Sequence, residues 1–530
     1  MSTVMKMKLQ RATAPENLGF DSNVIKRVLT QAKELKLYYH SVMIIRDGII
    51  AFECHRYPYT ADTPHCMYSI SKSIISIALG FALEENLIGF DSKVVDILPE
   101  YLKGREKDER LKMLTVRHLV SMKSGKVPSP LIDKAKTNWD EDLINAKWEA
   151  APGEKFRYVN ECTAMLARII TQITKMSVVD YLMPRLFEKL EIERPYWECD
   201  KRGIEAGAWG IRLSAESMAK IFLCVQNEGV FNGEQIIPRE YIRQAVLNQF
   251  NPEKPDKEDG YGFGFWRKSE NLYRGEGFFG QTAGIFEDSN TLVILTASQA
   301  HSGDLWGTFA KIVTEGMIEK NPDAKPDEEL VKMSKNQYAD VIEKNKLRSP
   351  FEQKFNNKEI RFKPHRFISK LGFPMSMLSL ATTQSARAKG GNISKIKIQF
   401  NSDEFVFSWY EDFSENTIKC GLNGEYLYSK CNIATHDFDV GGAAYWVDNN
   451  NLKIMIRPLQ SMARRDLNIE FFENGKVLMT PSTDPDMYAL FGSVVGAIRQ
   501  ISKNKVIQDL IEFAFRKFAE MLEPVHKGSI

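Results

Sequence analysis

Apolar positions in the first 320 residues follow two different spacings. Two apolar runs flank Asp47-Gly48, which predicts a β-hairpin over 41–53. Elsewhere apolar residues recur three and four positions apart, the spacing that gathers them on one face of a helix. This spacing predicts helices around 22–35, 74–83, 165–170, 214–225 and 305–318, and alternation predicts strands at 261–266 and 292–296. Helices enclosed between N- and C-terminal strands indicate an α/β sandwich with an antiparallel sheet.

The pattern changes after a charged, proline-containing segment at 321–328. Period-two segments then dominate, separated by turn signals such as Asn423-Gly424 and Asn474-Gly475. They predict an antiparallel β meander that closes into a small barrel or half-barrel. The tail over 487–521 has helical spacing; it is read as a helix or helix pair docked on its own domain, with an oligomer contact as the alternative. We therefore predict an α+β protein with domains 1–328 and 347–530 and a connecting helix, 329–346.

Composition narrows the function classes. The chain has 530 residues, which is enough for two or three domains, and 71 basic against 69 acidic residues give a net charge of +2. This balance gives no electrostatic case for nucleic acid or an anionic membrane as a partner. The seven cysteines form no Cys-x-x-Cys pair, and the N-terminus lacks an apolar signal-like run, so we expect a soluble cytoplasmic protein. No His/Cys/Asp cluster has ligand spacing, and neither a metal nor an organic cofactor is expected.

Chemistry enters with Ser69 and Lys72, at the start of a long apolar helix. Residues three apart share a helix face, so the hydroxyl and the amine are expected side by side. A lysine whose pKa is lowered can take the proton of a serine and make it a nucleophile. The same Ser-x-x-Lys spacing also occurs at Ser217–Lys220, Ser394–Lys397 and Ser502–Lys505, where a solvated face is the expected reading.

Five segments distinguish the first match from the others. In chain order they are Tyr68–Ser73, Leu114–Gly125, Pro152–Asn160, Trp209–Lys220 and Asn232–Pro238. Together they resemble the serine β-lactamase/penicillin-binding-protein superfamily over about residues 15–320. The resemblance is strongest to its class C-like esterase, D-aminopeptidase and nylon-oligomer hydrolase branch. It implies the β-lactamase-like sandwich, and the C-terminal region more loosely resembles the lipocalin-like barrels that follow this domain in some D-peptidases.

The resemblance implies a role for each residue. Ser69 is the nucleophile, Lys72 accepts its proton or tunes the acceptor, and Tyr158 is the second base, which returns the proton to the leaving group. A nearby ammonium is expected to lower the tyrosine pKa for this purpose. Asn160 is expected to orient Lys72 or to bind the acyl amide of the substrate. His118 is a competing candidate base, but a structural histidine is the favoured interpretation.

The third family motif is placed at Gly277–Gln281, where Gly280-Gln281 resembles the nylon-hydrolase-like form. Gly280 would let substrate approach the strand, the N–H of Gln281 would be an oxyanion donor, and Phe278 replaces the family's cation. The missing cation favours neutral esters, amides or thioesters. Arg274 and Glu276 could supply charge instead, although we expect them in an exposed loop.

We therefore predict a serine hydrolase that forms an acyl-enzyme on a small-molecule or short-peptide acyl substrate. Two alternatives stay open. One is an acyltransferase of the same fold, and the other is a non-catalytic binding or scaffold protein that kept the fold. Neither nucleic acid nor a membrane is an expected partner, and a homo-oligomer through the C-terminal region is a further alternative.

Overall fold

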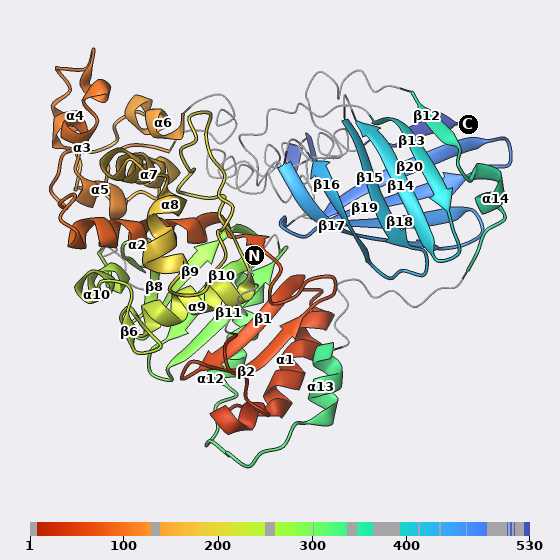
Figure 1. Ribbon diagram of the computed structural model, residues 1–530, viewed down its shortest axis with the longest axis horizontal. Helices are drawn as coiled ribbons and strands as arrows, with labels where there is room; N and C mark the ends of the chain where they lie inside the picture. The colour runs from red at the N-terminus through yellow and green to blue at the C-terminus, as the bar shows by residue number, and fades with distance from the viewer. Residues whose placement is uncertain are drawn as a thin grey trace. The chain divides into compact units, whose positions relative to one another are not determined.

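Figure 1 shows the computed structural model of the chain, with its two compact units. One unit comprises Met1–Ala297 with His301–Gln337, and the other comprises Ser298–Ala300 with Tyr338–Ile530. The structure describes residues 8–128, 138–249, 260–299, 302–335, 347–363, 393–411, 414–433, 436–462, 464–484, 506, 509–510, 513–514 and 524–530.

The first unit is built on an antiparallel sheet, as the sequence predicted. Its strands, in spatial order, are β2 (Ile49–His55), β1 (Tyr39–Arg46), β11 (Thr291–Ala297), β10 (Gln281–Phe286), β9 (Leu272–Gly277), β8 (Trp266–Ser269) and β7 (Gly260–Tyr261). The predicted hairpin is β1 and β2, joined by Asp47 and Gly48, which both have positive φ. The N-terminal hairpin and the later strands thus meet in one sheet, because β1 pairs with β11.

Helices cover both faces of this sheet. The described α-helices of this unit are α1 (Ser22–Glu34), α2 (Ser71–Glu84), α3 (Val94–Ile97), α4 (Glu109–Met113), α5 (Val116–Val120), α6 (Trp139–Asn145), α7 (Asn160–Thr174), α8 (Val178–Leu182), α9 (Ala215–Gln226), α10 (Arg239–Val246), α11 (Ser302–Phe309), α12 (Lys311–Thr314) and α13 (Glu328–Lys335). Strand β1 shows why both faces are covered. Val42 and Ile44 pack in one buried cluster with α1 and α11, whereas Met43 and Ile45 pack in another with α2, α7 and α9.

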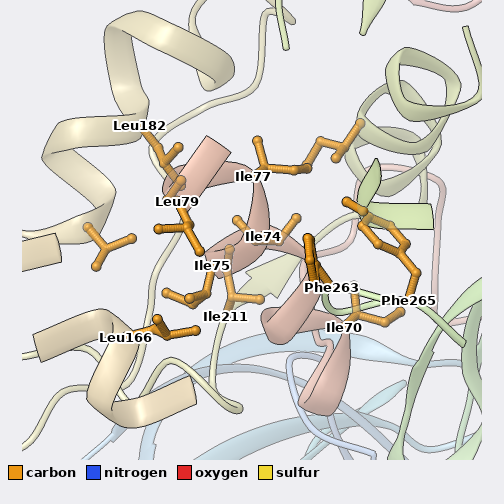
Figure 2. Packing of buried hydrophobic residues seen from close by; sticks show 14 of the residues in the cluster. Ile70, Ile74, Ile75, Ile77, Leu79, Leu166, Leu182, Ile211, Phe263 and Phe265 are labelled. Carbon is orange, nitrogen blue, oxygen red and sulfur yellow. The ribbon is translucent and has the colours of Figure 1, made fainter. Parts of the chain in front are cut away.

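Helix α2 is the most enclosed of the long helices. Its residues from Ser71 to Ala82 are all buried, and its apolar side chains contact Leu166 of α7 and Leu182 of α8 (Figure 2). Such all-round burial is typical of a helix at the centre of a core rather than at its surface. Gly80 marks a close approach: a Cβ there would lie 2.4 Å from Cδ1 of Tyr241 on α10.

Two predicted elements are divided in the structure. The strand expected at 261–266 is a turn between β7 and β8, and Gly264 in it has φ +83°. A Cβ on Gly262 would lie 2.0 Å from the Ala245 carbonyl oxygen, so glycine here serves a tight turn rather than a strand. The helix expected at 305–318 is the two helices α11 and α12.

The second unit confirms the predicted meander. Within its described residues the sheet has ten strands, and β15 also pairs with β17, which closes the sheet as a barrel (Figure 1). In spatial order the strands are β15 (Ser414–Gly421), β14 (Glu404–Glu411), β13 (Ile393–Phe400), β12 (Glu359–Phe362), β21 (His526–Ser529), β20 (Lys476–Asp484), β19 (Arg464–Phe471), β18 (Asn451–Pro458), β17 (His436–Trp446) and β16 (Leu427–Ile433). Helix α14 (Phe351–Phe355) contributes two phenylalanines to the core of this unit.

The remaining expectations are placed as follows. Of the predicted connecting helix over 329–346, α13 is described, and its Leu330 is buried in the cluster that contains α1. The predicted helical tail over 487–521 lies almost entirely outside the described residues. The domain limits 1–328 and 347–530 stay a prediction. Among the described helices, none combines the length and the apolar content that a membrane crossing requires.

The contact at Gly80 leads to a stability prediction. Gly80→Ala should lower the free energy of unfolding by about 1–2 kcal/mol, because overpacking against Tyr241 outweighs the helix propensity gained. Gly307→Ala in α11 is the matched control, since a Cβ there meets nothing within 4 Å. It should leave stability unchanged or raise it by up to about 1 kcal/mol. Urea denaturation of the two variants measures the difference, and equal midpoints would contradict the packing argument.

Candidate active site

Ser69 lies in a tight turn that leads into α2. The turn is the 3₁₀ segment η2 (Tyr68–Ile70), and α2 begins at the next residue. Tyr68 has φ +46°, a conformation that L side chains seldom adopt and that the surrounding structure must hold in place. Met67, Tyr68 and Ile70 are buried, whereas Ser69 is partly accessible. The turn therefore presents one hydroxyl from an otherwise enclosed segment.

Lys72 lies directly beside this hydroxyl. Its side chain is only 2% exposed, and its Nζ donates hydrogen bonds to Ser69 Oγ and to the Ala208 carbonyl oxygen, both at 2.9 Å. The amine also lies 4.8 Å from the centre of the Tyr158 ring. The spacing argument for Ser69 and Lys72 thus describes their placement, although the two residues belong to successive helical segments rather than to one α-helix.

Tyr158 approaches from the other side, two residues before α7 begins. Its ring stacks on Trp266 of β8 with 5.4 Å between the ring centres. Burial raises the pKa of Tyr158 above its usual value of 10; a hydrogen bond with Ser69 acts in the opposite direction, and the Glu276 carboxylate raises the pKa further. The expectation of a lowered tyrosine pKa is therefore wrong, because the effect of desolvation on the pKa outweighs that of the Ser69 hydrogen bond. The phenol is neutral at physiological pH.

The end of strand β9 packs against the turn that carries Ser69. A Cβ on Gly277 would lie 2.2 Å from the Met67 carbonyl oxygen. A Cβ on Gly275 would lie 2.5 Å from Cζ of Phe222 and 3.3 Å from Oγ of Ser73. Both positions exclude a side chain, so glycine lets β9 approach Ser69 closely.

A pocket of about 250 Å³ opens beside Ser69. Its walls combine the candidate catalytic groups with residues of β8, β9, β10 and α11. The lining residues are Ser69, Tyr158, Trp266, Arg274, Glu276, Gly277, Phe278, Thr282, Gly303 and Trp306. The sequence interpretation missed Trp266, Thr282, Gly303 and Trp306 as pocket residues, because they come from three elements, β8, β10 and α11, that only the fold brings together.

The predicted third-motif residues are only partly at this pocket. Phe278 lines it, with half of its side chain exposed. Gln281 is fully buried, and its amide is used internally: Nε2 donates to the Ala297 carbonyl at 2.7 Å and Oε1 accepts from Ala297 N–H at 3.1 Å. Gly280 and Gln281 are absent from the described lining, and so is Asn160, which is the half-buried first residue of α7.

The expectation that Arg274 and Glu276 lie in an exposed loop is wrong. Both belong to β9, and because they are two residues apart they share one face of the strand. Their side chains form an ion pair with each other, and Lys268 Nζ of the adjacent β8 lies 3.9 Å from Glu276 Oε1. The prediction of a neutral substrate started from Phe278 in place of the family's cation, and it stays a prediction, although Arg274 puts a cation in the pocket lining.

The competing candidates have structural roles. His118 belongs to a capping box at α5: its Nδ1 accepts from Thr115 N–H at 3.2 Å, and burial lowers its pKa. Lys220 is buried in α9 and donates to the Leu190 carbonyl at 3.0 Å. Ser394 and Lys397 lie on strand β13. Ser502 and Lys505 lie outside the described residues.

The family model described as Beta-lactamase matches residues 36–309. A curated relative, the 6-aminohexanoate-dimer hydrolase of Paenarthrobacter ureafaciens, is 23% identical over 221 residues, which are 38% of this chain and 56% of the relative. The chain thus spans little more than half the length of that relative.

Two solved structures are also similar to this chain. One is a putative 6-aminohexanoate-dimer hydrolase from Bacillus anthracis, which is 20% identical, covers 59% of this chain and 90% of its own, and has a TM-score of 0.48. The other is an octameric penicillin-binding protein homologue from Pyrococcus abyssi. It is 17% identical, covers 86% of this chain and 97% of its own, and has a TM-score of 0.44.

The internal use of Gln281 leads to a prediction. Gln281→Met should lower the free energy of unfolding by roughly 2–4 kcal/mol, because it leaves the buried N–H and C=O of Ala297 without these partners. Gln226→Met is a control for the loss of a glutamine amide: this side chain pairs at an exposed site with Asn290, and we expect a change within about 0.5 kcal/mol. Thermal and urea denaturation measure the free energy of unfolding of both variants. Similar losses in the two variants would contradict the role of the Gln281 amide in holding Ala297.

Proposed function

The chain belongs to the beta-lactamase family, because the Beta-lactamase family model matches more than half of the chain's length. From that premise we propose that the protein is a serine hydrolase. The proposed reaction proceeds through an acyl-enzyme on Ser69 and cleaves an ester or amide. The observation that carries the proposal is the placement of the Lys72 amine beside the Ser69 hydroxyl and the Tyr158 ring, with Ser69 and Tyr158 lining one pocket.

Acylation begins when Ser69 Oγ attacks the acyl carbon and passes its proton to an unprotonated Lys72 Nζ. The 2.9 Å separation of these atoms is within the range that direct proton transfer requires. Lys72 is buried, and burial in general favours the neutral form of an amine. The Ala208 carbonyl accepts a second hydrogen bond from Nζ and fixes the direction of the amine.

Tyr158 acts as a proton donor in this scheme. A phenol whose pKa is raised by burial holds its proton at neutral pH, so it can deliver that proton to the leaving group and then take up the proton that Lys72 received from Ser69. This role keeps the expected return of a proton to the leaving group, but it begins from the neutral phenol rather than from a base with a lowered pKa. In the second half-reaction, water replaces the leaving group, and the same groups act in reverse.

The negative charge that develops on the acyl oxygen needs donors. We assign this role to the backbone N–H groups of Ser69 and Phe278, in place of Gln281. Both residues line the pocket, and Gly277 brings the end of β9 against the turn that holds Ser69. Two such donors are worth several kcal/mol in acyl transfer.

The other elements of the proposal rest on the sequence. The β-rich unit is proposed as a separate domain, with homo-oligomerisation as an alternative role, and the cytoplasm is the proposed compartment. Transfer of the acyl group to an amine or alcohol instead of water uses the same first half-reaction. Hydrolysis and acyl transfer can be distinguished by experiment, because an added amine would receive the acyl group, and so change the product, only if transfer occurs.

The nucleophile can be tested by covalent labelling. A fluorophosphonate probe should add one adduct, located on Ser69 by peptide mass spectrometry, and Ser69→Ala should abolish it. Ser217→Ala is the matched control, because Ser217 has the same Ser-x-x-Lys spacing on α9 and should leave labelling unchanged. Absence of an adduct on the folded wild-type protein would favour the scaffold alternative and overturn the proposal.

The proton donor can be tested by kinetics. Tyr158→Phe should lower kcat for a 4-nitrophenyl ester by about 10²- to 10⁴-fold, the usual contribution of a positioned acid or base. Tyr241→Phe is the control. This hydroxyl is also buried, but it pairs with Ser76 Oγ at 2.7 Å, and neither residue belongs to the pocket lining. If the two variants lose kcat equally, Tyr158 has no special part in the reaction.

A further inference from the structure

We propose that Trp266 is a positioning residue for the reaction: its ring holds the Tyr158 phenol beside the Lys72 amine and limits the access of water to it. The inference rests on the proposed function, in which Tyr158 delivers a proton to the leaving group. Tyr158 lies outside the helices and strands, in the segment that precedes α7. The direction of its ring therefore depends on the side chains that surround it.

Two aromatic rings and one amine enclose the Tyr158 ring. Trp266 stacks on it, with 5.4 Å between the ring centres and 24° between the ring planes. Tyr261 meets Tyr158 edge to face at 5.9 Å, and it meets Trp266 in the same way at 4.9 Å. Lys72 Nζ lies over the ring, 4.8 Å from its centre. Aromatic pairs prefer stacked and edge-to-face geometries, so these contacts restrain the direction in which the phenol points.

Trp266 is itself fixed by the fold. It is the first residue of β8 and pairs with neighbours on both β7 and β9. The turn between β7 and β8 is anchored to α2, because Ser73 Oγ donates a hydrogen bond to the Gly264 carbonyl at 2.6 Å. A Cβ on Gly264 would lie 2.7 Å from the Lys72 carbonyl oxygen, so the turn touches the backbone of the helix at Lys72 itself. Helix α2 thus supports both Lys72 and Trp266, the two groups between which the phenol is placed.

The enclosure also keeps the phenol protonated. Among the described residues, the titratable and charged groups that face it are Ser69, Lys72, Glu276 and Tyr261. Burial has the largest effect on the pKa of Tyr158 and raises it, the Ser69 hydrogen bond lowers it, and the Glu276 carboxylate raises it. Loss of the Trp266 ring would admit water, which stabilises the phenolate and lowers the pKa toward the ordinary tyrosine value of about 10.

Kinetics with a 4-nitrophenyl ester test this role on the full-length protein. Trp266→Ala should lower kcat by about 10- to 100-fold, whereas Trp266→Phe keeps a ring that can stack and should recover most of the loss. In the Tyr158→Phe background, Trp266→Ala should lower kcat by less than about twofold further, because Trp266 acts through the phenol. Trp266→Leu keeps more of the apolar volume and provides the same comparison if Trp266→Ala does not fold.

The pH dependence of kcat gives a second readout. A deprotonated phenol cannot donate, so kcat of Trp266→Ala should fall above about pH 10, while wild-type kcat stays level to about pH 10.5. Trp306→Leu is the matched control and should keep the wild-type pH dependence. Trp306 also lines the pocket, but it stacks on Phe286 and lies under the Arg274 guanidinium. Additive losses in the Tyr158→Phe background, or a wild-type pH dependence in Trp266→Ala, would each overturn the inference while leaving hydrolysis intact.

Failure of the hydrolase proposal is distinguishable from this result. If the ester is not cleaved and Ser69 is not labelled, the ultraviolet absorbance of ionised tyrosine measures the enclosure without turnover. The difference between each protein and its Tyr158→Phe counterpart isolates the titration of this phenol. Ionisation that begins at least about one pH unit lower in Trp266→Ala than in the wild type supports the enclosure of Tyr158 by Trp266. Ionisation that begins at the same pH in both proteins rejects it.

Discussion

The hydrogen bond between Lys72 and Ser69 is the interaction on which the site depends. A lysine that is 2% exposed is costly unless polar groups surround its amine, and here Ser69 Oγ and the Ala208 carbonyl accept from it. This arrangement requires a rigid support. Helix α2 provides it, since its residues from Ser71 to Ala82 are buried among neighbouring helices and the sheet (Figure 2). The same helix therefore forms the core and positions the chemistry.

A second constraint comes from side chains that are missing. Gly275 and Gly277 let β9 lie against Phe222 of α9 and against the Ser69 turn, at distances that no Cβ would permit. The alternate residues of the strand, Arg274 and Glu276, then face the pocket. A strand that alternates glycine with charge serves two purposes at once. One face allows close packing, and the other gives the pocket its electrostatic character.

Much of this could be predicted from the sequence because it depends on local spacing. The separation of Ser69 and Lys72, the Asp47-Gly48 hairpin and the period-two strands of the second unit are short-range patterns. Errors occurred where the outcome depends on tertiary surroundings. The pKa of Tyr158 is set by its burial, which no local motif reports. The side-chain amide of Gln281 holds Ala297, a contact that the sequence did not indicate, and the role expected of its backbone N–H stays a prediction. For Arg274 and Glu276, their period-two spacing was a signal that could have placed them on one strand face.

The account is tested most directly by the rate at which Ser69 reacts with a fluorophosphonate in Lys72→Met, compared with the wild type and with Lys220→Met. Lys220 is an equally spaced and similarly buried lysine that lies outside the pocket lining. We predict that the second-order rate constant falls by about 10²- to 10⁴-fold in Lys72→Met and stays unchanged in Lys220→Met. A folded Lys72→Met protein that is labelled at the wild-type rate would contradict the role of Lys72 as the base for Ser69.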